Sequence, residues 1–127
     1  MIRLVIKGEV PAKKNSRIVL KNGRNIPSKR YQEWHAEAEA QVLKQKVLLS
    51  EVPVKKEVIV SIEFIHGDLR RRDSDNGTSS VLDLLCDTGI LTDDNWQIVR
   101  KLQITNTYEK NNPMCIIAVQ SLEGGAL

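Results

Sequence analysis

The chain is poor in the residues that form disulfides and structural zinc sites. Among its 127 residues there are only two cysteines and two histidines. Cys86 and Cys115 lie inside apolar runs and lack the CxxC or CxxH spacing of a zinc site, so we interpret both as buried, reduced thiols. His35 and His66 have no partner at metal-ligand spacing, and we expect surface or half-buried side chains. Neither a disulfide framework nor a zinc domain is indicated.

Long apolar runs, internal repeats and linkers are also missing. No stretch approaches the ~18 consecutive apolar residues of a membrane span, and Arg3 and Lys7 stand where a signal peptide would need an apolar run. A chain of 127 residues, of which 41% are hydrophobic, can build one packed core. We therefore expect a soluble intracellular protein with one domain over residues 1–122 and a mobile tail at 123–127.

Acidic residues are absent from Pro11 to Gln32, where seven basic residues give a local charge of +7. From Asp73 to the C-terminus, eight acids and three bases give −5, so the net charge of +3 averages over two unlike halves. A basic segment of this kind suits a phosphate backbone, although a solvated basic loop has the same composition. Its members are Lys13, Lys14, Arg17, Lys21, Arg24, Lys29 and Arg30, with Asn15 among its neutral donors.

Hydrophobic periodicity predicts the secondary structure. Apolar residues alternate at even positions from 2 to 6 and from 58 to 64, which indicates two half-buried strands. Asn22-Gly23 lies between short extended runs and can supply the positive φ values of a tight hairpin turn. Ser28 can cap a helix over about 29–47, whose apolar side chains are Tyr31, Trp34, Ala38 and Val42.

The second half of the chain predicts a helix of about three turns around residues 81–85, which Gly89 can end as a C′ residue. Residues 96–107 and 114–121 indicate two strands joined by the turn "EKNNP", and Trp96 is counted among the apolar strand positions. The fold class that follows is α+β: a single domain with one mixed β-sheet and two main helices packed on it.

The stretch "RRRDSDNGTSSVLDLL", residues 70–85, begins like a calcium loop but does not continue as one. With Asp73 as position 1, Gly77 falls at position 5 instead of 6, and Leu84 occupies position 12, where a bidentate Glu is required. An EF-hand is therefore excluded.

A catalytic metal site is the second interpretation of these acids. In an extended segment Asp73 and Asp75 point the same way, ~6–7 Å apart at the backbone, so both can reach one Mg²⁺ or Mn²⁺ ion. Asp93 and Asp94 follow a helix and a turn that could return the chain to the same end of the sheet. Carboxylates brought together repel each other unless a cation neutralises them. Taken alone, either motif also fits a solvated turn.

Three arginines, Arg70, Arg71 and Arg72, stand directly before Asp73. A site that cleaves a phosphodiester needs cations on the phosphate and metals on the attacking and leaving oxygens, and this segment offers both. A solvated charge run or a salt bridge to Asp68 is the alternative.

The order "PAKKNS", a basic hairpin, "RRRDSDN", a helix and "LTDDNW" resembles the RusA Holliday-junction resolvases, from the first strand to the last. The resemblance implies a RusA-like fold and a cytoplasmic, homodimeric, Mg²⁺-dependent endonuclease that makes paired symmetric nicks in four-way DNA junctions, with Mn²⁺ as a substitute ion. It places the metal and catalytic aspartates on Asp73, Asp75 and Asp94, with Asp93 as a neighbour in the site. The family often has a lysine on the first turn of the helix, where this chain has Ser79.

The leading hypothesis is therefore a structure-selective DNA endonuclease. Its rivals are a nucleic-acid-binding protein without catalysis, a metal-dependent nuclease for flaps, branched intermediates or RNA, and a plain scaffold domain. The residues expected to contact DNA are Lys13, Lys14, Asn15, Arg17, Lys21, Arg24, Lys29, Arg30, Arg70, Arg71, Arg72, Asn76 and Lys101.

Overall fold

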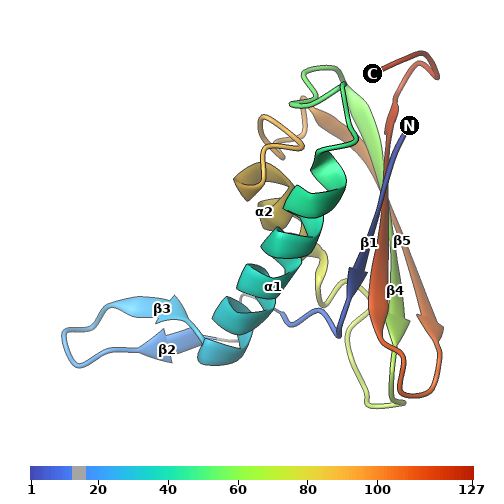
Figure 1. Cartoon of the computed structure of the whole chain (residues 1–127). Helices are drawn as coiled ribbons and strands as arrows, with labels where there is room; N and C mark the ends of the chain where they lie inside the picture. Colours follow the sequence, from blue (N-terminus) through green and yellow to red (C-terminus); the bar gives the residue numbers. More distant parts are fainter. Residues whose placement is uncertain (13–16) are drawn as a thin grey trace.

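A four-stranded sheet lies at the centre of the computed structural model, which describes residues 1–12 and 17–127 (Figure 1). Its strand order is β1-β6-β4-β5. β5 runs parallel to β4, and β6 runs antiparallel to both β1 and β4, so the sheet is mixed. The bounds are Ile2–Lys7 for β1, Val58–His66 for β4, Val99–Tyr108 for β5 and Met114–Ser121 for β6.

Two helices, α1 (Lys29–Lys46) and α2 (Thr78–Asp87), cover one face of the sheet (Figure 1). The Ser28 hydroxyl caps α1 by accepting a hydrogen bond from the Tyr31 backbone N–H at 3.2 Å. The core between helices and sheet contains the predicted apolar faces of both layers, among them Leu4, Ile6, Trp34, Val42, Val60, Ile62, Leu84 and Ile117. The predicted α+β domain is confirmed.

Glycines fix the two ends of α2. Gly77 lies so close to the core that a Cβ atom there would stand 2.7 Å from Val10 Cγ1 and 2.9 Å from Phe64 Cε1. Gly89 has φ +75°, as expected for the residue after a helix. The segments before and after α2, which carry the acidic motifs, are therefore held against the core at defined points.

The basic segment forms a small hairpin, β2 (Arg17–Val19) and β3 (Asn25–Pro27), which extends away from the sheet and the helices (Figure 1). Leu20 N donates to Arg24 O at 2.7 Å and Gly23 N donates to Leu20 O at 2.9 Å. Only Gly23 in this loop has a positive φ, +82°, so Asn22 does not share the left-handed conformation that we expected for both residues. The loop is the longer hairpin type in which a left-handed glycine follows a turn.

The strand predicted at 96–107 begins later, at Val99. The Asn95 carbonyl accepts hydrogen bonds from Ile98 N and Val99 N and holds the preceding residues in a turn. Trp96 is 73% exposed, and the Arg100 guanidinium lies 5.9 Å from its ring centroid, so Trp96 is not an apolar strand position. The segment "EKNNP" does join β5 to β6, but β4 lies between these two strands in the sheet.

At the C-terminus, Lys56 Nζ donates to the Ala126 carbonyl at 2.7 Å, and the half-buried Leu127 packs against the core. The mobility of residues 123–127 stays a prediction. Within residues 1–12 and 17–127, no helix has both the length and the apolar character needed to cross a membrane.

Candidate functional site

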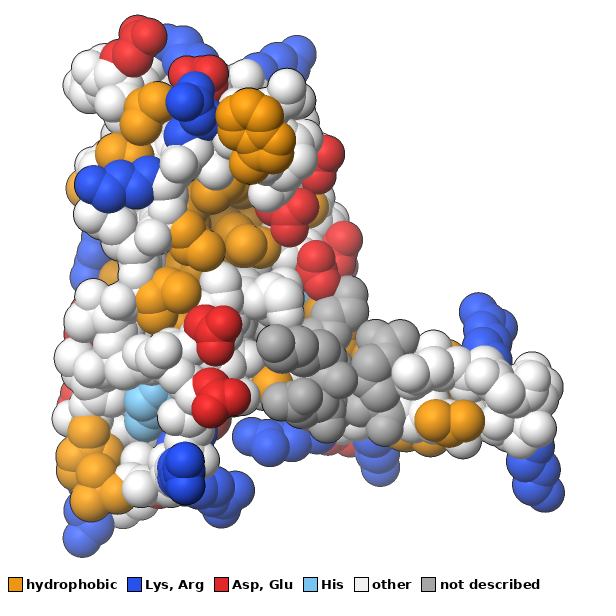
Figure 2. All heavy atoms as spheres, turned by 180° about the vertical axis from the view of Figure 1, so that it is seen from behind, with side chains coloured by type: hydrophobic (Ala, Val, Ile, Leu, Met, Phe, Trp, Pro, Cys, Tyr) orange, Lys and Arg blue, Asp and Glu red, His pale blue; other side chains and the backbone are white. Residues whose placement is uncertain are grey.

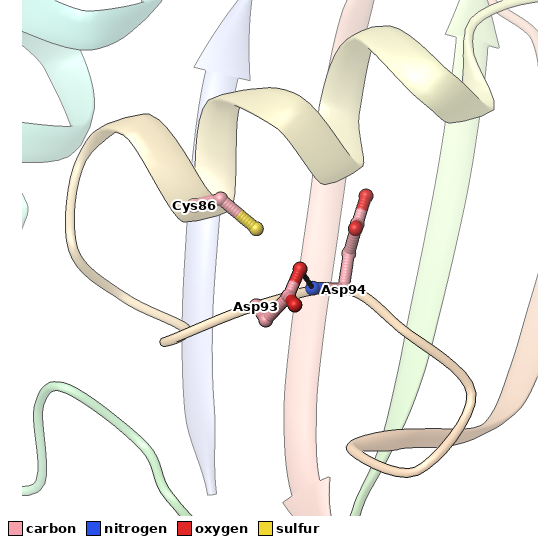
Figure 3. A group of neighbouring side chains, drawn as sticks. All are labelled: Cys86, Asp93 and Asp94. Carbon is pink, nitrogen blue, oxygen red and sulfur yellow. Dashed lines mark hydrogen bonds between the residues drawn. The ribbon is translucent and has the colours of Figure 1, made fainter.

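The second acidic motif lies beside the C-terminal half of α2. One carboxylate oxygen each of Asp93 and Asp94 and the Cys86 sulfur lie within 4.8 Å of one another. Figure 3 shows the Cys86 thiol pointing from α2 toward the acid pair. Asp93 is fixed by two donors, Asp94 N at 2.7 Å and Asn95 Nδ2 at 2.9 Å. In the part of the chain that the structure describes, this is the one group of three potential metal ligands that lie so close together.

The pKa values of Asp93 and Asp94 are shifted in opposite directions. Hydrogen bonds from the Asn95 side chain and the Asp94 backbone lower the pKa of Asp93. Desolvation, followed by the charges of Asp83 and Asp93, raises the pKa of Asp94. Asp94 is therefore a carboxylate whose negative charge is poorly compensated, which is the situation that a bound cation relieves.

The donor chemistry fits a hard divalent cation on its carboxylate side. Oxygen ligands suit Mg²⁺ and Mn²⁺, whereas a neutral thiol is a poor ligand for either ion. Burial, followed by the charges of Asp94 and Asp93, raises the pKa of the Cys86 thiol to about 11. Cys86 thus stays protonated near neutral pH, and the buried Cys115 has a pKa raised to about 12, mainly by desolvation. The interpretation of both cysteines as thiols without a disulfide agrees with the structure, although Cys86 is only half buried.

Asp73 and Asp75 lie at the other end of α2. Both side chains are exposed, in a turn where Asn76 N donates to Asp73 O at 3.1 Å and Thr78 N donates to Asp75 O at 3.0 Å. Their carboxylates do not belong to the close group around Asp94. The structure therefore places one predicted acid pair at the N-terminal end of α2 and the other beside its C-terminal half, and a metal site that contains both pairs stays a prediction.

Asp83 lies between the two pairs along α2 and is a residue that the sequence interpretation missed. It stands four residues after Ser79, so the two residues share a helix face. Its negative charge contributes to the raised pKa of Asp94, so Asp83 lies near the second acidic motif. The signal in the sequence was its spacing from the position of the family lysine.

A chain of hydrogen bonds fixes the turn that carries Asp73 and Asp75. Asn106 Nδ2 donates to the Ser74 carbonyl at 2.9 Å, and Asn106 Oδ1 lies 2.8 Å from His66 Nε2. The other ring nitrogen of His66 lies 2.8 Å from Glu9 Oε2. These hydrogen bonds connect the carboxyl ends of β1, β4 and β5, which lie at the same end of the sheet because the three strands run in the same direction.

His66 is consequently a positioning side chain and not merely a half-buried one, and Glu9 and Asn106 were not predicted. A polar residue at the end of each of three like-directed strands was the signal that could have found them. These ends also border a hollow of about 530 Å³, whose lining includes Leu69, Arg70, Asp73 and Tyr108.

A second hollow, of about 270 Å³, brings predicted DNA-binding residues together from distant parts of the chain. Arg30 comes from the first turn of α1, and the others come from the segment before α2. Its lining is Pro11, Ala12, Arg30, Arg70, Arg71, Arg72 and Asn76. A concave group of guanidiniums with an amide has the donors that bind a phosphate.

Arg72 is the least available of these arginines. Its guanidinium lies 2.9 Å from Asp68 Oδ1 and 3.3 Å from Glu9 Oε1, and its side chain is only 12% exposed. The salt bridge to Asp68 that we considered as an alternative is therefore present for Arg72. The side chain of Asp68 has its pKa lowered, first by this arginine.

The remaining predicted DNA contacts are spread over the surface. Lys21 and Arg24 are exposed on the projecting hairpin, and Lys29 is exposed beside Glu33 at 3.7 Å. Lys101 pairs in register with Ile59 on the sheet face that points away from the helices, so the structure does not bring it to the acids. Lys13, Lys14 and Asn15 lie outside the described residues, and Arg17 is described by its backbone alone.

Figure 2 shows one face of the molecule on which acidic side chains lie beside a stripe of hydrophobic ones, with basic side chains below them and on the hairpin.

The two serines at the start of α2 differ in role: Ser79 is exposed, whereas Ser80 is fully buried and donates from Oγ to the Pro11 carbonyl at 2.6 Å. Ser80 therefore ties the helix to the segment after β1.

Comparison with known proteins identifies a family. The family model described as "Endodeoxyribonuclease RusA" matches residues 7–120, which run from the last residue of β1 into β6 and include both acidic motifs. No curated protein matches the chain. The matched region covers most of the 127 residues, and the chain therefore belongs to the RusA endodeoxyribonuclease family.

Proposed function

We propose that this protein resolves four-way DNA junctions as a Mg²⁺-dependent homodimer that makes paired symmetric nicks during recombination and repair, in the cytoplasm of a bacterium or of a phage-infected cell. The observation that carries the proposal is the arrangement around α2: one acid pair precedes its first turn, the other lies beside its C-terminal half, and a hollow lined by Arg30 and Arg70–Arg72, the arginine hollow, borders its N-terminal end. Membership of an endodeoxyribonuclease family supports the nuclease part.

Each group of residues has a defined task in the proposal. Asp73, Asp75 and Asp94 hold Mg²⁺, and Asp93 orients the backbone of Asp94 through its 2.7 Å hydrogen bond. When bound, Mg²⁺ supplies Lewis acidity on the phosphate and lowers the pKa of a water for attack on phosphorus. Arg70 and Arg71 bind the phosphate next to the cut, and Mn²⁺ substitutes for Mg²⁺ because it accepts the same oxygen ligands.

The basic hairpin binds the arms of the junction. Lys21 and Arg24 are exposed on a segment that extends from the body of the domain (Figure 1), so they can reach a DNA arm beyond the cut site. Contacts to phosphates position the duplex without reading its sequence, and their strength falls with salt. Two copies related by a two-fold axis present two sites to opposed strands of a junction, which itself has approximate two-fold symmetry.

The test compares a mobile four-way junction with a linear duplex of the same sequence, each with Mg²⁺ and with EDTA. We expect paired nicks at symmetric positions in the junction, no nicks in the duplex and no reaction in EDTA. Equal cutting of both DNAs by the folded protein would contradict junction selectivity. Cutting that persists in EDTA would contradict the metal requirement.

A junction-binding protein without catalysis is the second candidate, and Ser79 is the observation that favours it. An exposed serine occupies the first turn of α2, where the family often has a lysine that can neutralise charge in the transition state. This candidate predicts salt-sensitive junction binding with no nicks in Mg²⁺ or Mn²⁺. A preference for flaps or other branched DNA in the same assay would instead indicate the rival metal-dependent nuclease for flaps and branched intermediates.

A further inference from the structure

The two edge strands of the sheet, β1 and β5, differ in whether other groups bond to their outer backbone N–H and C=O groups. At the β1 edge, the Gln45 side chain accepts from Val5 N at 3.0 Å and donates to Val5 O at 2.8 Å. Gln41 accepts from Lys7 N at 2.8 Å and lies 3.5 Å from Lys7 O. Two glutamines of α1 thus occupy backbone groups that a further strand would otherwise use, so this edge is closed to strand addition.

The β5 edge has no such cover in residues 1–12 and 17–127. No strand pairs with its outer side, and no backbone hydrogen bond reaches it from another segment there. From Leu102 to Tyr108 the strand has neither proline nor a charged residue, and most of its side chains are exposed. Proteins usually protect long edges of this kind, because unpaired N–H and C=O groups are a template for another strand.

The backbone of β5 shows which residues face outward. Glu109 N donates to His66 O at 2.9 Å, so odd-numbered residues at this end direct their backbone groups to β4. Successive residues of a strand alternate in this respect, and the register with β4 is unbroken from Lys101 to Tyr108. Leu102, Ile104, Asn106 and Tyr108 therefore direct their N–H and C=O groups out of the sheet.

We propose that β5 pairs antiparallel with β5 of a second copy of this chain, with Thr105 opposite Thr105 on the two-fold axis. This register places Lys101 opposite Glu109, and it places Leu102, 40% exposed, opposite Tyr108, 47% exposed. A register shifted to centre on Ile104 places Lys101 opposite Thr107 and Tyr108 opposite Arg100, with neither complementary pair. Charge and apolar area both favour the Thr105-centred pairing over this shifted register.

The pairing has a consequence for the candidate site. A two-fold axis perpendicular to the sheet keeps the helix-covered faces of both copies on the same side. Asn106, which bonds to the turn of Asp73 and Asp75, is the residue next to Thr105. The two acidic turns therefore flank the axis on one side of the dimer. The use of two sites on one junction rests on the proposed function. Self-association of the chain does not, because it is measured without DNA.

Thr105→Cys provides the test. Thr105 directs its backbone to β4, so Thr105 and its copy form a non-hydrogen-bonded pair with Cα atoms about 4.5 Å apart, within the range of a disulfide. Thr107→Cys is the matched control, because it changes the same residue type two positions along the same sheet face, and its copy lies several residues away. Wild type reports any cross-link from Cys86 or Cys115.

Sedimentation should show a wild-type dimer, and mild oxidation should cross-link Thr105→Cys at least tenfold faster than Thr107→Cys. A monomeric wild type, or equal cross-linking rates in the two variants, would overturn the proposal. A wild-type dimer without the Thr105→Cys cross-link places the interface elsewhere and leaves the proposed nuclease intact. If Thr105→Cys cross-links selectively but the protein cuts no junction, the interface is supported and the proposed function is contradicted.

A second pair of variants tests the position of the two-fold axis at Thr105 without oxidation. Thr105→Lys and Thr105→Asp each put like charges opposite each other, so each alone should be monomeric at concentrations where wild type is dimeric. Their equal mixture should dimerise again, because Lys then faces Asp. If the mixture stays monomeric, or if either variant alone dimerises as well as wild type, Thr105 is not on the axis.

Discussion

The side chain of Asn106 in β5 donates a 2.9 Å hydrogen bond to the carbonyl of Ser74, the residue between Asp73 and Asp75. This bond joins the predicted metal-binding turn to the sheet, and through His66 it reaches Glu9 after β1. The turn is thus positioned by residues that are not expected to touch either metal or DNA.

Asn106→Ala should therefore weaken metal binding without removing a ligand. Loss of a residue that orients metal ligands typically costs 10–100-fold in affinity or activity, and we expect the Mg²⁺ concentration for half-maximal cleavage to rise about tenfold. Gln103→Ala, on the same strand and bonded to Ser61 on the opposite face, is the control. An unchanged Mg²⁺ requirement in Asn106→Ala, with the dimer intact by sedimentation, would refute the positioning role.

Asp94→Asn should stabilise the metal-free protein near neutral pH. The pKa of Asp94 is raised in the folded state, so the folded protein binds a proton more readily than the unfolded chain, and stability falls as pH rises through the folded pKa. The asparagine removes that cost, and the melting temperature should exceed that of wild type at pH 7 but match it at acid pH.

With Mg²⁺ present, the melting temperature of wild type should exceed that of Asp94→Asn at pH 7. Mg²⁺ should raise the melting temperature of wild type by binding the folded state, and raise that of Asp94→Asn much less. A lower melting temperature of Asp94→Asn than of wild type at pH 7 without metal would show that Asp94 is compensated by a partner.

Arg71→Gln should weaken junction binding in a salt-dependent way. Arg71 lines the arginine hollow, and the removal of one arginine–phosphate ion pair should lower the slope of log affinity against log salt by about 1. Arg3→Gln, an exposed arginine on β1, is the matched control and should bind like wild type. Identical slopes for Arg71→Gln and wild type would remove Arg71 from the DNA interface.

Ser79→Lys should speed cleavage. It restores a cation on the exposed first turn of α2, and a positioned charge or proton-transfer group typically contributes at least about tenfold to the rate. The lysine is unfavourable at a helix N-terminus by about 0.3–1 kcal/mol, so a slightly lower melting temperature should accompany the gain. Ser79→Gln supplies length without charge. Equal rates in Ser79→Gln and Ser79→Lys would show that charge at this position is not limiting.

Local sequence patterns predicted the elements well where one face is buried. Alternation in β1 and β4 and the three- and four-residue steps of α1 follow from burial on one side, and the buried residues are those expected, such as Leu4, Ile62 and Val42. Trp96 was misplaced because hydrophobicity could not reveal the Asn95-centred turn that precedes β5.

The long-range features could not be predicted from spacing. The order β6-β4-β5 separates two strands that are consecutive in the chain, and Cys86 meets Asp93 and Asp94 only because the segment after α2 folds back along the helix. The Glu9–His66–Asn106 chain joins three strand ends at sequence separations of 57 and 40 residues. Such contacts depend on topology, which no local pattern encodes.

The decisive measurement is the rate of junction cleavage in Mg²⁺ by Asp75→Asn and Asp94→Asn, with Glu123→Gln, an exposed acid near the C-terminus, as the control. If both acid pairs that flank α2 serve one metal-dependent nuclease, each aspartate variant should lose at least about 100-fold in rate while it still binds the junction, and Glu123→Gln should cut like wild type. Full cleavage by either aspartate variant would contradict the assignment of that acid pair to the site.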